Sequence, residues 1–184
     1  MSKPQWKTTN QTIVSKNPYW RYLKDDIESA SGAKGEYHFI QTLGSVLIVP
    51  RVGLDLYVMV RQYRYIQKKF SIEFPGGGID DGESNLEAAH RELLEETGFH
   101  GENPKEIGSF SPCLGLVDEH CHVYLMDAKD GNKPQEGEWE KMNTIILSHS
   151  EIETRIANGE IWSGMALSAW MLAQRAQKKD YGWV

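Results

Sequence analysis

The stretch that most constrains this chain is residues 72–99, IEFPGGGIDDGESNLEAAHRELLEETGF, where a glycine-rich turn runs into an acidic segment. Ser84 and Glu87 have the S-x-x-E spacing of a capping box, which predicts a helix beginning at the residue after Ser84. Gly98 stands where a left-handed C-terminal cap is favoured, so the helix should end at the residue before it. We therefore expect a helix over residues 85–97, directly after the glycine-rich turn.

One face of this helix carries three carboxylates. At about 100° per residue, Glu92, Glu95 and Glu96 fall within about a third of the helix circumference. Like charges four residues apart cost a few tenths of a kcal/mol in water, so the cluster disfavours the helix unless a cation lies between the acids. Oxygen-only ligands suit Mg²⁺ or Mn²⁺ rather than Zn²⁺. A solvated acidic face is the usual explanation of a Glu-rich helix, and the preceding glycine turn favours a metal site here.

The spacing from Gly77 to Phe99 matches every fixed position of the pattern G-x5-E-x7-R-E-U-x-E-E-x-G-U, where U is a bulky apolar residue. This pattern is the Nudix box, and the sequence therefore resembles the Nudix hydrolases. In that family the box forms a loop–helix–loop that binds metal and the diphosphate of the substrate. The resemblance implies two or three Mg²⁺ ions, with Mn²⁺ as a substitute. It assigns metal ligands to Glu92, Glu95, Glu96 (which also acts in catalysis) and the Gly76 carbonyl, and structural roles to Gly77, Glu83 and Arg91.

Residues 61–65, RQYRY, precede a box that is led by EFPGG. This combination resembles the Nudix subgroup that hydrolyses ADP-ribose and other nucleoside diphosphate sugars. Without the resemblance, an exposed strand end with Arg and Tyr side chains lying along the surface explains RQYRY equally well, and Pro112 reads simply as a loop breaker. The resemblance implies substrate contacts by Arg61, Arg64, Glu73, Pro112 and Leu114.

Residues 127–140, DAKDGNKPQEGEWE, form an expected loop rich in glycine and acid. A solvated acidic loop is the simplest interpretation. In the resembling enzymes a loop at this place delivers the glutamate that acts as general base. Counting back from the next helix start favours Glu140, with Glu138 as the alternative.

Composition sets limits on the class of protein. The chain has 184 residues, 40% of them hydrophobic, and a net charge of −6, which suits one globular domain with a full core. The acidic balance argues against a nucleic-acid partner. No apolar run approaches the length of a membrane span, and the N-terminus lacks an apolar signal core. We therefore expect no membrane association and a cytoplasmic protein.

The expected fold is α/β, and the resemblance implies a Nudix α/β/α sandwich around a mixed β-sheet, preceded by an N-terminal β-hairpin arm. We expect two parts: residues 1–43, the arm and hairpin, and residues 44–184, the Nudix hydrolase domain. Residues 1–17 are polar and are expected to be an irregular arm. The other expected elements are strands at 19–25, 36–42, 45–50, 56–61, 121–126 and 142–147, and helices at 149–158 and 164–179.

Residues 18–42 carry a dense set of aromatic side chains. The hairpin either folds back onto its own domain or, as in the resembling enzymes, crosses to a second subunit. The resemblance implies a homodimer in which Trp20 or Tyr22 contacts the base of the substrate, and stacking on an aromatic ring suits a nucleotide base.

The resulting hypothesis is a Mg²⁺-dependent pyrophosphatase that converts a nucleoside diphosphate sugar, such as ADP-ribose or GDP-mannose, to a nucleoside monophosphate and a sugar phosphate. The same box fits Nudix hydrolases of dinucleoside polyphosphates, coenzyme A or capped RNA. A non-hydrolytic nucleotide-sensing module and a Nudix-like isomerase are alternatives of other classes. The complete set of box acids favours hydrolysis over both.

Overall fold

The computed structural model of this chain describes residues 6–130 and 142–180. The chain divides into two compact units. The first comprises residues 1–44 with residues 111–120, and the second comprises residues 45–110 with residues 121–184. The segment 111–120 thus belongs with the N-terminal part, although it follows the acidic helix in the sequence.

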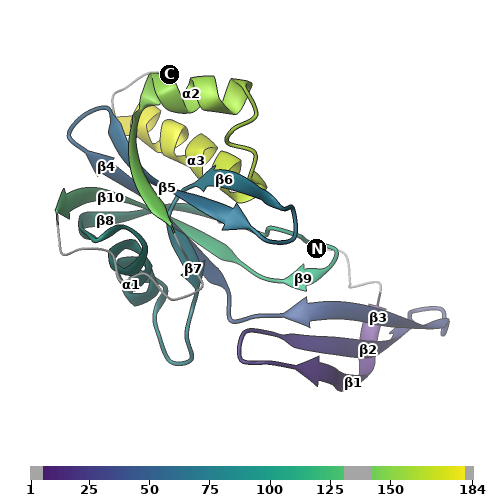
Figure 1. Cartoon of the computed structure of the whole chain (residues 1–184). Helices are drawn as coiled ribbons and strands as arrows, with labels where there is room; N and C mark the ends of the chain where they lie inside the picture. Colours follow the sequence, from purple (N-terminus) through teal and green to yellow (C-terminus); the bar gives the residue numbers. More distant parts are fainter. Residues whose placement is uncertain (1–5, 131–141, 181–184) are drawn as a thin grey trace. The chain divides into compact units, whose positions relative to one another are not determined.

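The first unit is built on a four-stranded sheet of order β1-β2-β3-β9 (Figure 1). Its strands are β1 (Trp6–Lys16), β2 (Arg21–Ser29), β3 (Lys34–Gln41) and β9 (Val117–Asp118). Strand β2 pairs antiparallel with both β1 and β3, and the short β9 pairs parallel with β3. The expected hairpin is therefore two strands of a larger sheet.

The expectation of an irregular arm is wrong for β1. All eleven of its residues are exposed, so no apolar alternation marks the strand in the sequence. Pairing with β2 holds it instead, together with polar side chains: Gln11 donates to Asp25 at 2.9 Å, and Asn10 donates to Asp26 at 3.1 Å. A polar edge strand of this kind is defined by its partner rather than by its own sequence.

The second unit contains a mixed seven-stranded sheet. Its main order is β11-β5-β4-β10-β8, with β6 paired to β5 and β7 paired to β4. Strands β4 and β10 are parallel, and the other paired strands are antiparallel. The strands are β4 (Ser45–Val52), β5 (Leu56–Arg64), β6 (Lys69–Glu73), β7 (Gly76–Gly78), β8 (Phe99–Phe110), β10 (Cys121–Asp130) and β11 (Asn143–Ser148).

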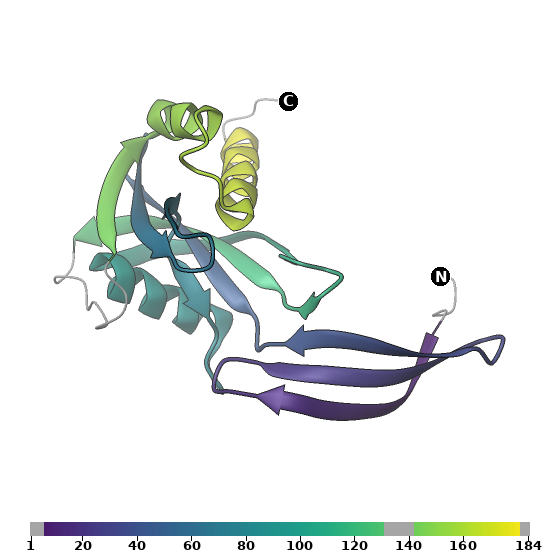
Figure 2. The same cartoon turned by 45° about the vertical axis from the view of Figure 1, so that its right-hand side comes forward.

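Three helices cover the two faces of this sheet: α1 (Asn85–Thr97), α2 (His149–Ala157) and α3 (Gly164–Asp180). Figures 1 and 2 show α1 on one side and α2 with α3 on the other. Strand β4 alternates accordingly, since Val46 and Ile48 pack in the cluster that contains Leu93 of α1. Leu47 and Val49 pack in the cluster that contains Trp170 of α3. The expected α/β/α sandwich around a mixed sheet is confirmed.

Local chemistry sets the ends of the helices. The Ser84 side chain accepts from the Glu87 backbone N–H while the Glu87 side chain accepts from the Ser84 N–H, which is the predicted capping box. Gly98 has a φ of 75° and caps the C-terminus of α1 in the left-handed conformation. Ser148 and Glu151 form a second capping box at the start of α2. None of the helices in the described part of the chain has both the length and the apolar character needed to cross a bilayer.

Candidate active site

The glycine turn lies against strand β4. Strand β7 pairs antiparallel with residues 45–47, which brings Gly76 and Gly77 to the edge of the sheet just ahead of α1. A Cβ atom added at Gly76 would overlap the backbone oxygen of Val46. A Cβ atom added at Gly77 would lie 2.6 Å from the carboxyl carbon of Glu92. Glycine is needed at Gly76 because backbone approaches backbone there, and at Gly77 it leaves room for the Glu92 carboxylate.

Two of the three candidate metal ligands meet at this turn. The Glu92 carboxylate occupies the space beside Gly77, and Glu96 Oε2 accepts a hydrogen bond from the Gly76 N–H at 3.0 Å. Glu92 and Glu96 are one helical turn apart, so both carboxylates face the same segment of backbone. Helix and turn together thus gather two acids around the backbone of Gly76 and Gly77.

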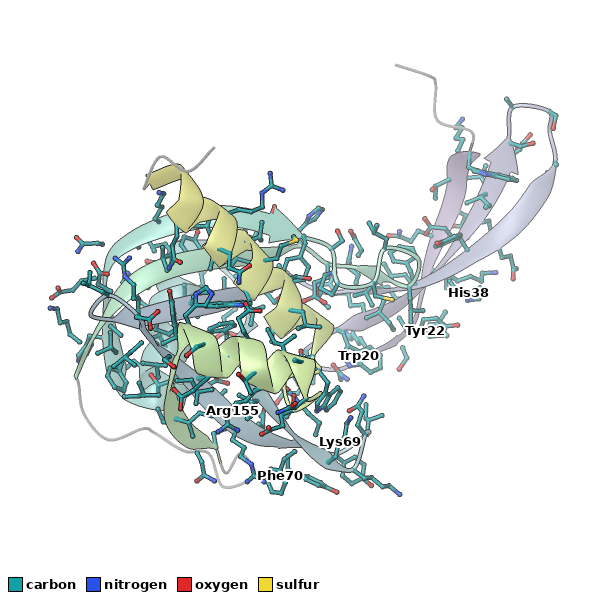
Figure 3. The ribbon with its side chains drawn as sticks, turned by 90° about the horizontal axis from the view of Figure 1, so that it is seen from above. Trp20, Tyr22, His38, Lys69, Phe70 and Arg155 are labelled. Carbon is teal, nitrogen blue, oxygen red and sulfur yellow. The ribbon has the colours of Figure 1, made fainter. Side chains whose placement is uncertain are left out.

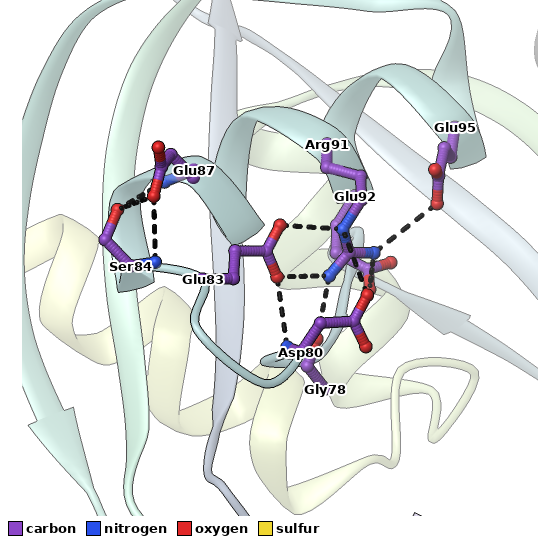
Figure 4. Close-up of polar contacts among 8 residues, drawn as sticks. All are labelled: Gly78, Asp80, Glu83, Ser84, Glu87, Arg91, Glu92 and Glu95. Atoms are coloured by element: carbon purple, nitrogen blue, oxygen red, sulfur yellow. Dashed lines mark hydrogen bonds and ion pairs between the residues drawn. The ribbon is translucent and has the colours of Figure 1, made fainter. Parts of the chain in front are cut away.

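Arg91 bridges the acids of the box (Figure 4). Its Nε and Nη2 donate to the two oxygens of Glu83, at 2.9 and 2.8 Å. Nη1 donates to Glu92 at 2.7 Å and to Glu95 at 3.4 Å. A further bond from Nη2 to the Gly78 carbonyl, at 3.0 Å, ties the guanidinium to the turn.

These bonds set the electrostatics of the box. The Arg91 guanidinium holds the pKa of Glu83 below its usual range, and the acids in turn raise the pKa of Arg91. Glu83 also accepts from the Asp80 backbone N–H at 3.1 Å, which folds the turn back toward the helix. Sequence reasoning did not single out Asp80 or Gly78, although the DDG run at 80–82 is a turn signal that points to this stretch.

The donors at this site suit a hard divalent cation. Glu92 and Glu96 meet at the glycine turn and supply carboxylate oxygens, the kind of ligand that Mg²⁺ takes. Glu95 lies toward Arg91, and 46% of its side chain is exposed. Among the residues that the structure describes, no group of three acidic, His or Cys side chains stands ready as a complete metal cluster. Backbone oxygens and water would have to complete the coordination.

The β5–β6 hairpin places the two arginines of RQYRY differently. Arg64 donates to both oxygens of Glu73, from Nε at 2.7 Å and from Nη2 at 2.6 Å. The Arg61 guanidinium lies 3.7 Å from the centre of the Phe70 ring. Glu73 itself is buried. The structure thus joins Arg64 to Glu73 and does not bring Arg61 to the same partner.

Four further candidate residues belong to the first unit and are described within it. Trp20 is exposed, and its backbone N–H donates to the Asn17 side chain at 2.9 Å. The Tyr22 hydroxyl lies 2.9 Å from Nδ1 of His38, and Figure 3 shows both side chains on the sheet. Pro112 and Leu114 lie in the 111–120 segment, where Leu114 is exposed.

The two candidate general bases, Glu138 and Glu140, lie outside the described residues. The described chain stops at residue 130 and resumes at residue 142, directly before β11. Their assignment stays a prediction.

A family model for the NUDIX domain matches residues 43–162 of this chain. The chain therefore belongs to the Nudix family, as the box at residues 77–99 predicts. The matched range holds the glycine turn, α1 and the β5–β6 hairpin.

Two curated relatives match more than two thirds of this chain, at 29% and 28% identity. A CMP-5′-(N-acetyl-N-hydroxy-3-aminopropyl)phosphonate hydrolase of Streptomyces rubellomurinus is 29% identical over 126 residues, 68% of this chain and 61% of that protein. The ADP-sugar pyrophosphatase of Mus musculus is 28% identical over 169 residues, 80% of this chain and 76% of that protein. The chain thus spans about three fifths of the Streptomyces relative and about three quarters of the mouse relative.

A solved structure described as an ADP compounds hydrolase matches this chain with a TM-score of 0.81 and 22% identity, covering 100% of both chains. At that identity the likeness establishes the fold. It supports the mixed α/β architecture that the sheet order shows.

Proposed function

We propose that this chain is a Mg²⁺-dependent pyrophosphatase that hydrolyses the diphosphate of nucleoside diphosphate sugars, with ADP-ribose and other ADP-sugars as the first candidates. The observation that carries the proposal is the meeting of Glu92 and Glu96 at the Gly76–Gly77 turn. Glycine-supported carboxylates facing one backbone segment suit a cation that in turn binds a diphosphate. The substrate class is supported by the mouse relative, whose name is ADP-sugar pyrophosphatase.

In this mechanism Glu92, Glu95, Glu96 and the Gly76 carbonyl would hold the metal. Bound Mg²⁺ would supply neutralisation of the diphosphate and polarisation of its oxygens. Arg91 keeps Glu83, the turn and α1 in register, so that the carboxylates stay in place between turnovers. Arg64, on the adjacent hairpin, would donate to a phosphate oxygen, for which a planar guanidinium is well shaped.

The chemical step is the displacement by water, at one phosphorus atom, of the other phosphate, which leaves with the bridging oxygen. The water oxygen bonds to phosphorus, the bridging P–O bond breaks, and the water proton goes to a glutamate. We assign this general base to Glu140, with Glu138 as the alternative. The products are a nucleoside monophosphate and a sugar phosphate.

We also propose that the first unit forms the contact of a homodimer. Among the described residues of this unit, Leu23 is the one buried hydrophobic side chain. Trp6, Ile13, Tyr19 and Tyr37 are exposed on the same unit. A sheet with so small a core gains stability when a second surface covers it, and Trp20 or Tyr22 would then contact the base of a bound substrate.

The test is a screen of the purified protein with Mg²⁺ against ADP-ribose, GDP-mannose, UDP-glucose, diadenosine polyphosphates and coenzyme A. Products are identified by mass, and the reaction is run in ¹⁸O-water to locate the phosphorus that is attacked. The expected result is Mg²⁺-dependent release of AMP and ribose phosphate from ADP-ribose. Turnover of coenzyme A or diadenosine polyphosphates alone would move the protein to another Nudix substrate class.

A further inference from the structure

The β5–β6 hairpin sorts its side chains onto the two faces of the sheet. Tyr57 and Met59 of β5, and Ile72 of β6, pack in the cluster that also contains the α2 and α3 residues. Since side chains alternate along a strand, Arg61 follows Tyr57 and Met59 onto that face. Arg64 is three residues after Arg61, so its side chain lies on the opposite face of the sheet, where Val46 and Ile48 of β4 pack against α1. Of the two arginines, Arg64 is thus the one on the α1 side of the sheet.

Glu73 also lies on the α1 side of the sheet, and it is buried. It pairs in the ladder with Val60, whose parity is that of Arg64, and it is only 7% exposed. A buried carboxylate needs a partner that replaces the hydrogen bonds and the charge stabilisation that water gave it. The two short parallel hydrogen bonds from Arg64, at 2.7 and 2.6 Å, provide that partner. A guanidinium held by two parallel hydrogen bonds has little freedom to rotate.

The residue directly opposite Arg64 in the ladder is Lys69. Two cations facing each other across a hairpin repel. Lys69 instead extends its ammonium to 3.8 Å from the centre of the Trp162 ring, and Figure 3 shows Lys69 beside Phe70 on this hairpin. Each cation therefore has its own partner, Glu73 for Arg64 and the Trp162 ring for Lys69.

We propose that Glu73 is a positioning residue that fixes the Arg64 guanidinium on the α1 side of the sheet, where Arg64 meets a phosphate of the substrate. This inference rests on the proposed function, and it changes the role expected for Glu73 from a substrate contact to a support for one. Arg64 keeps 44% of its side chain exposed, whereas the Glu73 side chain is 9% exposed, so the arginine is the partner that a ligand can reach. A pre-oriented guanidinium loses less conformational freedom on binding, which strengthens binding without a new contact.

The test is a double-mutant cycle on the intact protein with ADP-ribose and saturating Mg²⁺. Arg64→Ala should raise KM about 10- to 100-fold, the size expected for a lost charge-assisted hydrogen bond. Glu73→Gln should raise KM about 3- to 10-fold and change kcat by less than about 3-fold. When Arg64 is already alanine, Glu73→Gln should change KM less than about 2-fold, because there is no guanidinium left to orient.

A second readout follows the arginine itself in the ligand-free protein. The Arg64 Nε–H signal in a ¹⁵N NMR spectrum, assigned by its absence in Arg64→Lys, should be sharp and slow to exchange in the wild type. It should broaden in Glu73→Gln. Arg155 and Glu160 form an exposed pair of the same chemistry at 2.6 Å, so Arg155→Ala and Glu160→Gln are the matched controls and should leave KM unchanged.

Three outcomes would overturn the inference, and they can be told apart. If the KM effects of Arg64→Ala and Glu73→Gln multiply, Glu73 contacts the substrate itself or acts elsewhere. If Glu73→Gln leaves both KM and the Arg64 signal unchanged, Glu73 does not hold the arginine. If the wild type hydrolyses no nucleotide sugar at all, the proposed function fails and with it the phosphate contact of Arg64, whereas the Arg64 signal still tests whether Glu73 holds the guanidinium.

Discussion

Arg91 donates two parallel hydrogen bonds to Glu83, at 2.9 and 2.8 Å, and so joins the loop before α1 to the second turn of that helix. The same guanidinium reaches Glu92 at 2.7 Å. A cluster of carboxylates that would otherwise repel is therefore held together by a cation from the chain itself. The box can therefore fold without bound metal, because Arg91 offsets the repulsion between its carboxylates.

This pair predicts an acid-sensitive contribution to stability. Arg91 lowers the pKa of Glu83 from its ordinary value of 4.5, so the stabilisation is fully present above that pH. It is lost as the pH falls through the lower folded-state pKa, because protonated Glu83 no longer attracts Arg91. Glu83→Gln should lower Tm at pH 7 by about 2–8 °C, since Arg91 loses a charged partner.

The measurement is thermal unfolding from pH 7 to pH 3 in EDTA, which keeps metal out of the comparison. The Tm difference between wild type and Glu83→Gln should shrink below pH 4.5. Glu160→Gln, which removes the acid of an exposed arginine pair, is the control and should change Tm by less than about 2 °C. A constant difference across the whole range would contradict the assigned role of the Glu83 charge.

The two glycines of the turn should respond differently to a methyl group. Gly77→Ala places a Cβ against the Glu92 carboxylate, which is the end of a flexible side chain and can shift. We expect little loss of stability and a rise of about 10-fold or more in the Mg²⁺ concentration needed for half-maximal rate, one tenfold step being about 1.4 kcal/mol. Gly76→Ala places its Cβ against the backbone of β4, so it should lower Tm instead.

Rates measured against Mg²⁺ concentration, with Tm for both variants, check this prediction. Excess Mg²⁺ should restore part of the Gly77→Ala rate. Normal Mg²⁺ dependence in that variant would show that Glu92 is not held by the turn in the working enzyme.

Much of the box was predictable because its signals are local. A capping box at Ser84, a left-handed cap at Gly98 and the fixed spacing of the acids lie within one short stretch, and the structure confirms both helix ends. The alternation of β4 between two helix layers follows in the same way from an apolar run. Features of this kind need no knowledge of what lies far away in the chain.

Other features depend on which segments pair with one another, and a single stretch of sequence does not predict them. Strand β1 has no apolar face and forms because β2 lies beside it. The 111–120 segment joins the first unit through contacts such as the Tyr37 hydroxyl with the Gly115 carbonyl at 3.0 Å, across 78 positions in sequence. The pairing of Arg64 with Glu73 depends on the register of a hairpin, and strand ends are where that register is hardest to predict.

Glu96→Gln should separate catalysis from folding. Gln keeps an oxygen that can accept from the Gly76 N–H, so the turn should stay in place. It loses the charge that a metal requires, and we expect kcat to fall at least about 100-fold. Steady-state rates at saturating Mg²⁺, with Tm as the control for folding, decide the matter. Full activity would remove Glu96 from the metal site.

The general base is tested by a pair of neighbouring substitutions. Glu140→Gln should lower kcat with little change in KM, because the proton transfer belongs to the transition state. Glu138→Gln should have a smaller effect. Steady-state rates against pH compare the two, and the reverse ranking would assign the base to Glu138. Normal rates in both variants would place the base outside this loop.

The last prediction concerns assembly. The first unit exposes Trp6 at 50%, Ile13 at 53% and Tyr37 at 47%, while Leu23 is the one buried hydrophobic side chain among its described residues. Exposed apolar surface of this extent is costly in water. We expect a homodimer at micromolar concentration, measured by light scattering on the intact chain. Trp20→Ala should raise KM for ADP-ribose more than it lowers kcat, because a stacking ring acts on binding.

Tyr19, which is 83% exposed and next to Trp20 in sequence, provides the matched control. Tyr19→Ala should leave KM within about 2-fold of the wild type. Trp20→Ala should have the larger effect, because an aromatic stack contributes roughly 0.5–1.5 kcal/mol to binding. A monomeric mass would exclude the dimer, and an unchanged KM in Trp20→Ala would leave Tyr22 as the candidate for the base. Tyr22→Phe then separates a role of the ring from a role of the hydroxyl, because it keeps the ring and removes only the hydroxyl that lies 2.9 Å from His38.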